Sequence, residues 1–291
     1  MKQSAKRAAL FLVPCTLLMV FSVFFPVLIT FGYSLKHMNL TEPLNEEFVG
    51  AVNYTQVLTG AEFRSALLNS LAVLAMVIVI GMAVSLAIAL VLHQKTRITP
   101  LLMAVVIVPW ALPPIVNGIM WKFIFFPGPG LVNKLLEAAG LIQSPVNWIV
   151  DRRLFLLVVS VVVAWRIVPF SAVVILSNLE NIPRTYYEAM VLEGSTPFQT
   201  FRYITLPLIL PSLGIVLINL TTTAINVFDE VIALSGYQFE NQTLLVYNYA
   251  TTFQFLDFGL GSAISYVIMA ISAVFGYFYV RNMTVEKVYK G

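Results

Sequence analysis

The sequence predicts an all-α polytopic membrane protein with six transmembrane helices. Of its 291 residues, 59% are apolar and only 11% are charged, whereas soluble proteins carry about 25% charged residues. The mean hydropathy of +0.88 points the same way. So little polar surface cannot enclose the core of a water-soluble enzyme, and it also excludes a disordered scaffold and a nucleic-acid-binding domain.

Six apolar runs are long enough to cross the roughly 30 Å hydrocarbon core of a bilayer, which takes about 20 helical residues. They cover residues 8–33, 66–92, 98–121, 154–179, 204–228 and 258–280. The first run follows a basic N-terminus, as in a signal peptide, but it is too long and no small-residue cleavage site follows, so we expect a retained span. The third run contains four prolines, which predict a kinked or broken helix packed against protein rather than lipid. We expect residues 1–291 to form a single transmembrane domain.

The distribution of Lys and Arg predicts that both termini lie in the cytoplasm. In this orientation ten basic residues face the cytoplasm, namely Lys2, Lys6, Arg7, Lys95, Arg97, Arg184, Arg202, Arg281, Lys287 and Lys290. Six face the exterior, namely Lys36, Arg64, Lys122, Lys134, Arg152 and Arg153. The lone cysteine, Cys15, lies inside the first run, so no disulfide within the chain is possible.

Residues 180–206, between the fourth and fifth runs, carry the signals of a helix followed by a turn. Pro183 is placed as a first-turn proline, where its missing N–H costs nothing, and Gly194 can adopt the left-handed conformation that ends a helix. Between them, residues recur at helical spacing on one face: Ile182, Tyr186, Ala189 and Met190. A first short helix is therefore predicted between Pro183 and Gly194.

A second short helix is predicted directly after the glycine. Thr196, Pro197 and Gln199 form a capping-box pattern with proline at the first helical position. We expect the two helices to lie parallel to the membrane on its cytoplasmic side, joined by a glycine elbow. A short amphipathic helix is unstable alone in water and needs a partner. Residues 180–203 carry two Arg and three Glu, a net charge of −1, which favours a groove in another protein over anionic lipid headgroups.

This segment resembles the EAA motif of the carbohydrate-type permeases of binding-protein-dependent ABC importers. The motif begins with an isoleucine–proline pair, continues with a Y-E-A core, an acidic residue and a glycine, and ends with I-T-L-P and a second proline. The matching residues in this sequence are Ile182, Pro183, Tyr187, Glu188, Ala189, Glu193, Gly194, Ile204, Thr205, Leu206, Pro207 and Pro211. The sequence departs from the motif at Met190 and Ser195, where the family pattern has alanine.

The similarity extends over most of residues 10–280. Further residues resemble the first outer loop and the second, third and fourth spans of sugar permeases: Phe48, Gly50, Asn53, Tyr54, Phe63, Asn69, Pro109, Trp110, Pro113, Trp121, Gly130, Asn133, Leu136, Trp165, Pro169 and Phe170. The turn expected after the fifth span is replaced by residues 235–238, which read S-G-Y-Q, and this departure bears on the substrate class.

The resemblance implies a type I (MetI-like) ABC importer permease fold with a cytoplasmic coupling helix, in a bacterial or archaeal cytoplasmic membrane. It implies three partners besides the lipid bilayer: a second homologous permease, a dimer of ATPase subunits that binds ATP and Mg, and an extracytoplasmic solute-binding protein. No cofactor on this chain and no nucleic acid are implied. The coupling positions carried over from the family are Tyr187, Glu188, Ala189, Glu193 and Gly194.

Catalysis within this chain is not expected. The phosphate-binding pattern G-x-x-x-x-G-K-[ST] does not occur in the sequence. His37 and His93, the two histidines, fall on opposite sides of the membrane, so neither is placed to activate a buried serine. No cluster of metal-ligating residues is evident. We predict a transporter subunit without an ATPase site of its own.

A polar stripe on the fifth span is the predicted solute pathway. Its members share one helical face: Asn219, Thr222, Thr223, Asn226 and Glu230. Polar side chains inside a membrane face a cavity or another helix, and neutral amide and hydroxyl groups suit polyhydroxyl solutes. Ser265 and Tyr266 of the sixth span are candidates for the same cavity. The alternative is that these groups join helices by hydrogen bonds.

Arg166 is the only charged residue inside an apolar run. It either binds an anionic solute or pairs with a carboxylate or carbonyl at a helix interface, and we favour the pairing. Three functions remain open. The first is a permease that moves a sugar or oligosaccharide by ATP-driven alternating access, and the second is a permease for glycerol phosphate or another anionic sugar derivative. The third is a secondary carrier, for which Asp229 and Glu230 are the only candidate coupling carboxylates.

Overall fold

The computed structural model describes residues 12–283, which fall into two compact units. The first unit comprises residues up to Arg64 together with Asn248–Ile271, and the second comprises Ser65–Tyr247 together with the residues from Ser272 onward. The first four residues of the first predicted span lie outside the described residues, and so do five of the basic residues used to predict the orientation: Lys2, Lys6, Arg7, Lys287 and Lys290.

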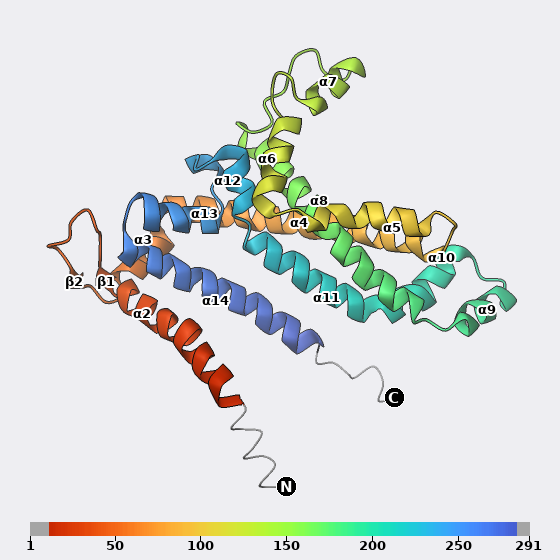
Figure 1. Cartoon of the computed structure of the whole chain (residues 1–291), viewed down its shortest axis with the longest axis horizontal. Coiled ribbons are helices and arrows are strands. Elements are labelled where there is room, and N and C mark those ends of the chain that lie inside the picture. The colour runs from red at the N-terminus through yellow and green to blue at the C-terminus, as the bar shows by residue number, and fades with distance from the viewer. Residues whose placement is uncertain (1–11, 284–291) are drawn as a thin grey trace, which may run out of the picture. The chain divides into compact units, whose positions relative to one another are not determined.

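Each predicted apolar run is helical in the described part of the chain. Five helices are long and apolar enough to cross a membrane: Leu12–Ser34, Ala61–His93, Arg152–Glu180, Pro197–Ile225 and Phe258–Tyr279. The remaining run is a pair of helices, Thr99–Ala111 and Pro114–Ile124, bent by 101° (Figure 1). The all-α polytopic fold class is therefore confirmed, and the third run is broken as its prolines predict.

The first unit begins with the helix Leu12–Ser34. It contains a π-helical turn, η1 (Val20–Phe24), followed by α2 (Phe25–Ser34). Pro26 has no amide hydrogen to donate to the carbonyl group four residues earlier. The π turn, which holds one extra residue, lies just before Pro26 and accommodates the missing hydrogen bond. The most apolar stretch of this helix buries none of its residues inside the chain, so its side chains are free for lipid or for another protein.

A short hairpin follows, which the sequence analysis did not predict. Strand β1 (Lys36–His37) pairs antiparallel with β2 (Glu47–Phe48). Two-residue strands carry no alternating pattern in the sequence, and their pairing depends on contacts from elsewhere in the chain. The rest of the unit consists of α3 (Val52–Thr59), the first turn of α4 (Ala61–His93), a π turn, η5 (Ala250–Gln254), and the first half of α14 (Phe258–Met283).

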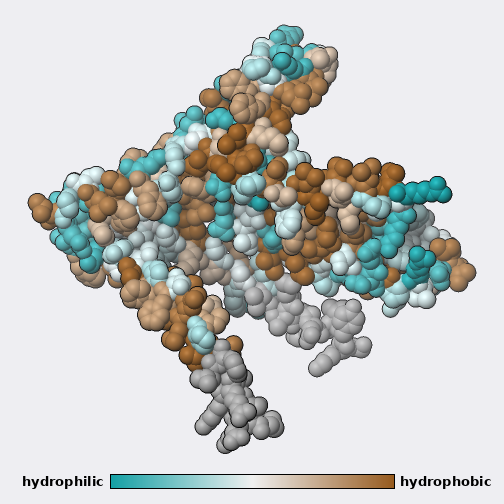
Figure 2. All heavy atoms as spheres, in the orientation of Figure 1, coloured by the Kyte–Doolittle hydropathy of each residue, from teal (hydrophilic) through white to brown (hydrophobic). Residues whose placement is uncertain are grey.

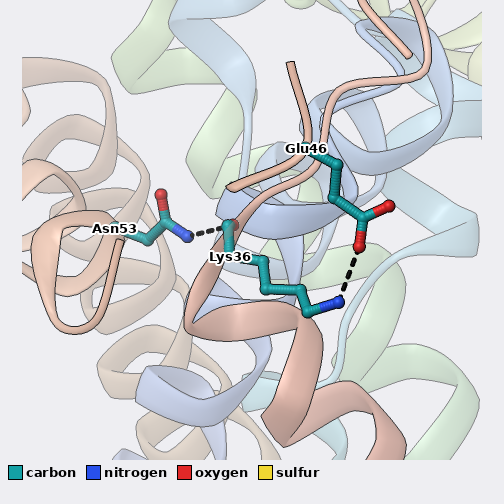
Figure 3. A network of polar contacts seen from close by, with 3 residues as sticks. All are labelled: Lys36, Glu46 and Asn53. Atoms are coloured by element: carbon teal, nitrogen blue, oxygen red, sulfur yellow. Dashed lines mark hydrogen bonds and ion pairs between the residues drawn. The ribbon is translucent and has the colours of Figure 1, made fainter. Parts of the chain in front are cut away.

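Asn53, at the start of α3, holds this hairpin in place. Its Nδ2 donates hydrogen bonds to the carbonyl oxygens of Ser34 and Lys36, at 3.0 and 2.8 Å. The Lys36 Nζ lies 2.6 Å from Glu46 Oε1, and the hydrogen bond to Glu46 raises the pKa of the Lys36 amine above its ordinary value. Figure 3 shows Asn53 and Glu46 approaching Lys36 from opposite directions. The side chain of Asn53 thus ties the loop's backbone to α3, and an exposed ion pair ties the loop to itself.

The second unit is built around α8 (Arg152–Glu180), which carries more buried side chains than any other described element. Asp151 caps its N-terminus by accepting hydrogen bonds from the backbone N–H groups of Arg153 and Leu154. Around α8 lie α5 (Thr99–Ile107), a 3-10 turn η2 (Val108–Ala111), α6 (Pro114–Ile124), α11 (Leu206–Ile225) and α12 (Asp229–Ser235). The remaining elements are α7 (Leu131–Ala138), α9 (Arg184–Leu192), α10 (Pro197–Thr200), a π turn η3 (Phe201–Thr205), a 3-10 turn η4 (Phe239–Asn241) and α13 (Leu244–Tyr249).

The two halves of the broken third run have different surroundings. Pro113 is extended, so the chain changes direction before α6 begins at Pro114. Asn117 of α6 donates from Nδ2 to the carbonyl oxygen of Val162 in α8, at 3.1 Å. A Cβ atom on Gly118 would lie 2.5 Å from the Cβ of Ala233, so only glycine allows α6 and α12 to approach this closely. The prediction of packing against protein therefore holds for α6, whereas α5 contributes no buried residue.

Candidate functional site

The predicted first short helix of the coupling segment is present as α9, between α8 and the fifth span. Ile182 is buried just before it. Pro183 has an extended backbone and occupies the N-cap of α9, one position earlier than the first-turn position predicted. An N-cap residue keeps non-helical angles, and the ψ of 136° at Pro183 meets that requirement.

Gly194 ends α9 in the predicted left-handed conformation, with φ +71°. Its N–H donates to the carbonyl oxygen of Val191 at 3.0 Å, and the N–H of Ser195 donates to that of Met190 at 3.0 Å. These are the two bonds of a Schellman motif, which satisfies carbonyl groups at a helix end. The Ser195 hydroxyl adds a bond to the same Met190 oxygen, at 2.7 Å. The glycine elbow is therefore confirmed.

The predicted capping box follows the elbow. The backbone N–H of Gln199 donates to Thr196 Oγ1 at 3.3 Å, and the N–H of Thr196 donates to Gln199 Oε1 at 2.8 Å. The helix that starts here does not stop, however, because α10, η3 and α11 form one helix from Pro197 to Ile225. The prediction of a separate second short helix is thus wrong. The missing donor of Pro207 is accommodated by the π turn before it.

Tyr187 attaches α9 to the second unit. Its ring packs against the hydrophobic core, and its hydroxyl lies 3.4 Å from the hydroxyl of Thr205, a buried residue at the end of η3. Figure 1 shows α9 and α10 at one end of this unit, away from α6 and α12. Of the five predicted coupling residues, Tyr187 is thus the one that faces inward.

The other predicted coupling residues face outward. Glu188, Ala189, Glu193 and Gly194 are all exposed. Within residues 12–283, the Glu188 carboxylate has no ion pair. Large apolar side chains beside it are also uncovered, with exposed fractions of 89% for Leu192 and 74% for Phe198. Uncovered apolar side chains next to carboxylates are typical of a surface that docks into another protein.

A polar pocket of about 270 Å³ lies at the opposite end of α11. Thr222, Thr223, Asn226 and Glu230 line it, so the structure brings together four of the five predicted stripe residues. Asn226 is the C-cap residue that directly follows α11, and its Nδ2 donates to the carbonyl oxygen of Thr222 at 2.8 Å. The chain then turns into α12, which begins with Asp229 and Glu230. Hydroxyl, amide and carboxylate groups thus offer both donors and acceptors inside one small volume.

A smaller pocket of about 170 Å³ adjoins this polar pocket and shares Thr222 and Asn226 with it. On its other side it is lined by residues of α14 that belong to the same unit, among them Tyr279. The Tyr279 hydroxyl is hydrogen-bonded to the Thr221 hydroxyl at 2.5 Å. Thr222 and Asn226 therefore line both spaces, and they are the two exposed members of the stripe.

Arg166 pairs with a carboxylate, one of the two kinds of partner at a helix interface that the sequence analysis favoured over an anionic solute. Its Nε lies 2.8 Å from Glu230 Oε1, and both groups line the polar pocket. Glu230 is only 2% exposed. The predicted pathway residue Glu230 is therefore also the partner of Arg166, and the pair joins α12 to α8. An isolated buried charge is costly, so each group compensates for the burial of the other.

Three predicted pathway residues lie apart from this pocket. Asn219 is one turn earlier in α11, and its buried Oδ1 has no hydrogen-bond partner in the described part of the chain. Ser265 and Tyr266 belong to the first unit. The Ser265 hydroxyl accepts a hydrogen bond from Asn248 Nδ2 at 2.8 Å, and the Tyr266 hydroxyl donates to the carbonyl oxygen of Val27 at 2.5 Å. Tyr266 also packs edge-on against Phe31. In the described residues these two side chains join helices.

A polar network outside the predicted set fixes the loop between α12 and α13. Asn69 of α4 donates from Nδ2 to the carbonyl oxygens of Glu240 and Gln242, at 3.0 and 2.9 Å. Its Oδ1 accepts from Arg152 Nε at 2.8 Å. The resemblance singled out Asn69, but its partners are two backbone carbonyls some 170 residues away and the side chain of Arg152, which no local pattern in the sequence identifies.

Comparison with known families identifies the family to which this chain belongs. Residues 78–285 match a family model described as the binding-protein-dependent transport system inner membrane component. The chain belongs to this family. It is accordingly a multi-pass membrane protein and a permease component of an ABC transport system. The resemblance seen in the EAA-like segment is thereby confirmed.

Individual relatives of this permease cover nearly its whole length. It is 31% identical to the trehalose/maltose transport system permease protein of Thermococcus litoralis over 283 residues, which cover 96% of this chain and 94% of that protein. It is 27% identical to the trehalose transport system permease protein of Mycobacterium tuberculosis, with 96% and 90% covered. The fold matches a chain in the crystal structure of a bacterial ABC transporter involved in alginate import, with a TM-score of 0.82, 19% identity and 97% of each chain covered. The predicted permease fold is confirmed.

Proposed function

We propose that this permease moves a carbohydrate across a cytoplasmic membrane by alternating access, driven by ATP that a partner subunit hydrolyses. The observation that carries the proposal is the single helix Pro197–Ile225, which joins the exposed elbow at Gly194 to the polar pocket at Asn226. A displacement of α9 by a motor protein is thereby linked to the wall of a pocket suited to hydroxylated solutes. The named relatives that transport trehalose and maltose support the substrate class.

The partners follow from the same proposal. The exposed face of α9, with Glu188, Ala189 and Leu192, would sit in a cleft of an ATPase subunit, and ATP and Mg would be bound there. A second homologous permease would cover the helix Leu12–Ser34, whose most apolar stretch buries none of its residues inside this chain. An extracytoplasmic binding protein would deliver the solute to the loops opposite α9. Both termini would lie in the cytoplasm.

The runner-up functions have less support. A permease for an anionic sugar derivative needs an unpaired cation in the pathway, but the charge of Arg166 is balanced by Glu230. A secondary carrier needs a carboxylate that is free to exchange a proton or an ion during transport. Glu230 is held by Arg166, so only Asp229 remains for that role.

Uptake of radiolabelled trehalose, maltose and glycerol phosphate by the assembled transporter tests the proposal. We expect Glu188→Lys to lower both ATPase stimulation and uptake by about tenfold or more. The carboxylate of Glu188 would face a cationic group of the ATPase, and a lysine in its place would put two positive charges together, which costs several kcal/mol at an interface. Glu137→Lys is the matched control, because Glu137 is an exposed carboxylate near the end of α7. Retained ATPase binding and stimulation in Glu188→Lys would contradict the coupling role.

The same assay tests the pocket. Asn226→Ala removes one hydrogen-bonding group, so we expect the apparent affinity for the transported sugar to fall about fivefold while ATPase binding is unchanged. Asn181→Ala is the matched control, because Asn181 also follows a helix end and also donates from Nδ2 to the carbonyl oxygen four residues earlier, at 2.9 Å. Equal effects of the two substitutions would assign Asn226 a structural role only.

A further inference from the structure

An apolar groove runs along α5 in the second unit. Because α5 buries none of its residues, it leaves two adjoining hollows of about 620 and 220 Å³ between itself, α4 and α8. Ile88 of α4 and Val106 of α5 line both hollows, so the two form one continuous groove. Every lining side chain is aliphatic, proline or tryptophan. Figure 2 shows the hydrophobic surface over α5.

The two ends of the groove differ in chemistry. At one end, near Pro109, Trp110 stacks on Phe170 with ring centroids 5.7 Å apart. At the other end, Leu92 and Leu102 line the groove next to the loop that joins α4 to α5. This loop, residues 94–98, is exposed and carries two cations, Lys95 and Arg97.

Of these two cations, only Arg97 lacks an ion pair among the described residues, so it is the one whose charge is free for a ligand. The Lys95 Nζ is paired with Glu180 Oε1 at 3.0 Å. Arg97 is exposed and forms no ion pair with any residue between 12 and 283. The groove thus has an apolar interior, an aromatic end and an arginine at its opposite mouth. This is the charge and polarity distribution of a site for an amphiphile with an anionic head.

We propose that the groove binds one acyl chain of an anionic phospholipid and that the phosphate of this lipid pairs with Arg97. Helix α5 and turn η2 together rise about 20 Å at 1.5 Å per residue. One leaflet of the hydrocarbon core is about 15 Å thick, so the groove spans a single leaflet. Arg97 lies on the side that the Lys and Arg distribution assigns to the cytoplasm, where anionic headgroups attract basic residues.

The size of the groove favours an acyl chain over a helix of another protein. A 20 Å length of helix about 10 Å across occupies roughly 1,600 Å³, so the two hollows together can seat only part of the width of a helix. Exposed side chains such as Val84, Val91 and Val105 border the groove, so an acyl chain could enter from the side.

Lipid retention on the purified full chain tests the proposal. The probes are dioleoylphosphatidylglycerol and dioleoylphosphatidylcholine, added to the detergent-solubilised permease, and native mass spectrometry counts the lipids retained. We expect phosphatidylglycerol to be retained about fivefold better, the preference given by about one basic residue near a headgroup. Arg97→Gln should abolish this preference. Arg281→Gln, which removes the same charge at the end of α14, should preserve it.

Filling the groove tests the acyl chain separately from the headgroup. Ala87 lines the groove and is exposed, so Ala87→Phe should reduce retention of both lipids without unfolding the protein, which a thermal unfolding midpoint checks. Ala75→Phe adds the same ring to an exposed alanine on another face of α4, which lines neither hollow, and should change nothing.

Three results would overturn the proposal. The first is equal retention of the two lipids by the wild-type chain. The second is retention that Ala87→Phe does not change. The third is loss of the retained lipid when the chain is assembled with its partner subunits, which would show that a protein covers the groove.

Discussion

At the scale of single residues, the ion pair between Arg166 and Glu230 is the contact that constrains the polar pocket most. The two groups come from α8 and α12 and are both largely removed from water. Breaking a buried pair by removing one partner leaves an uncompensated charge, which costs about 3–5 kcal/mol. Replacing both partners by apolar residues of similar size is often neutral. The pair therefore holds α12 in place and also keeps Arg166 from acting as a free anion site.

We expect Glu230→Gln to lower the free energy of unfolding by about 3 kcal/mol, because Arg166 then stays buried without a counter-charge. Thermal unfolding in detergent measures this. Asp229→Asn is the control, because Asp229 lines the same pocket but forms no ion pair with any described residue. The double variant Arg166→Met/Glu230→Leu should recover most of the loss. A Glu230→Gln variant as stable as the wild-type chain would show that the pair contributes nothing.

The sequence predicted the kind of partner that Arg166 has, but not its identity. A lone intramembrane charge requires a counter-group, so a carboxylate or carbonyl at a helix interface was the favoured interpretation. Glu230 is 64 residues away and was assigned to the pathway stripe by helical spacing. That spacing assumed a helix through residue 230, whereas α11 ends at Ile225 and α12 begins at Asp229. The pocket forms because the chain turns there, and only the tertiary packing determines this turn.

At the scale of elements, the elbow between α9 and α10 was the most predictable part of the fold. Its glycine and its capping box act through neighbours within six residues, and local chemistry of this kind is legible in a sequence. The length of the following helix was not predicted, because the apolar run begins only near Ile204 while the helix begins at Pro197. The hairpin at Lys36 was not predicted because it depends on a contact from outside the loop, namely with Asn53 in a separate helix.

We expect Gly194→Ala to destabilise the end of α9 by about 1 kcal/mol or slightly more, the cost of a left-handed backbone for a residue with a Cβ. A Cβ there meets no atom within 4 Å, so crowding adds nothing. ATPase stimulation by the reconstituted transporter should fall as the elbow angle loses definition.

Gly140 provides the matched control for Gly194→Ala. It ends α7 with φ +70° and with the same pattern of hydrogen bonds, and its Cβ position is equally open. Gly140→Ala should cost the same stability and leave ATPase stimulation intact. If the two substitutions impaired stimulation equally, the effect would come from general instability rather than from the elbow.

At the scale of the whole molecule, the apolar runs could be predicted from the sequence. The existence of a bend in the third run could be predicted too, but its angle and its packing could not. Four prolines indicated a break in the third run, but the angle of 101° and the unequal packing of its halves depend on Asn117, Gly118 and their partners in α8 and α12. The orientation in the membrane stays a prediction, because it rests on the positions of Lys and Arg.

Cysteine accessibility in intact cells measures the orientation. In a Cys15→Ser background, which lacks cysteine, we expect Glu188→Cys to react with a membrane-impermeant maleimide only after the cells are permeabilised. Glu42→Cys, in the exposed loop between β1 and β2, should react in intact cells. The reverse pattern would place α9 outside the cell and would remove the basis for coupling to an ATPase.

The uninterrupted helix from Pro197 to Ile225 has a mechanical consequence. Its 29 residues extend for about 43 Å, and a helix is far stiffer along its axis than the turns at either end. An axial shift imposed beside the capping box would arrive at Asn226 almost undiminished and without delay. The movement driven by ATP hydrolysis and the movement that releases the solute would then be the same helix displacement, and no series of intermediate rearrangements would be needed to synchronise them.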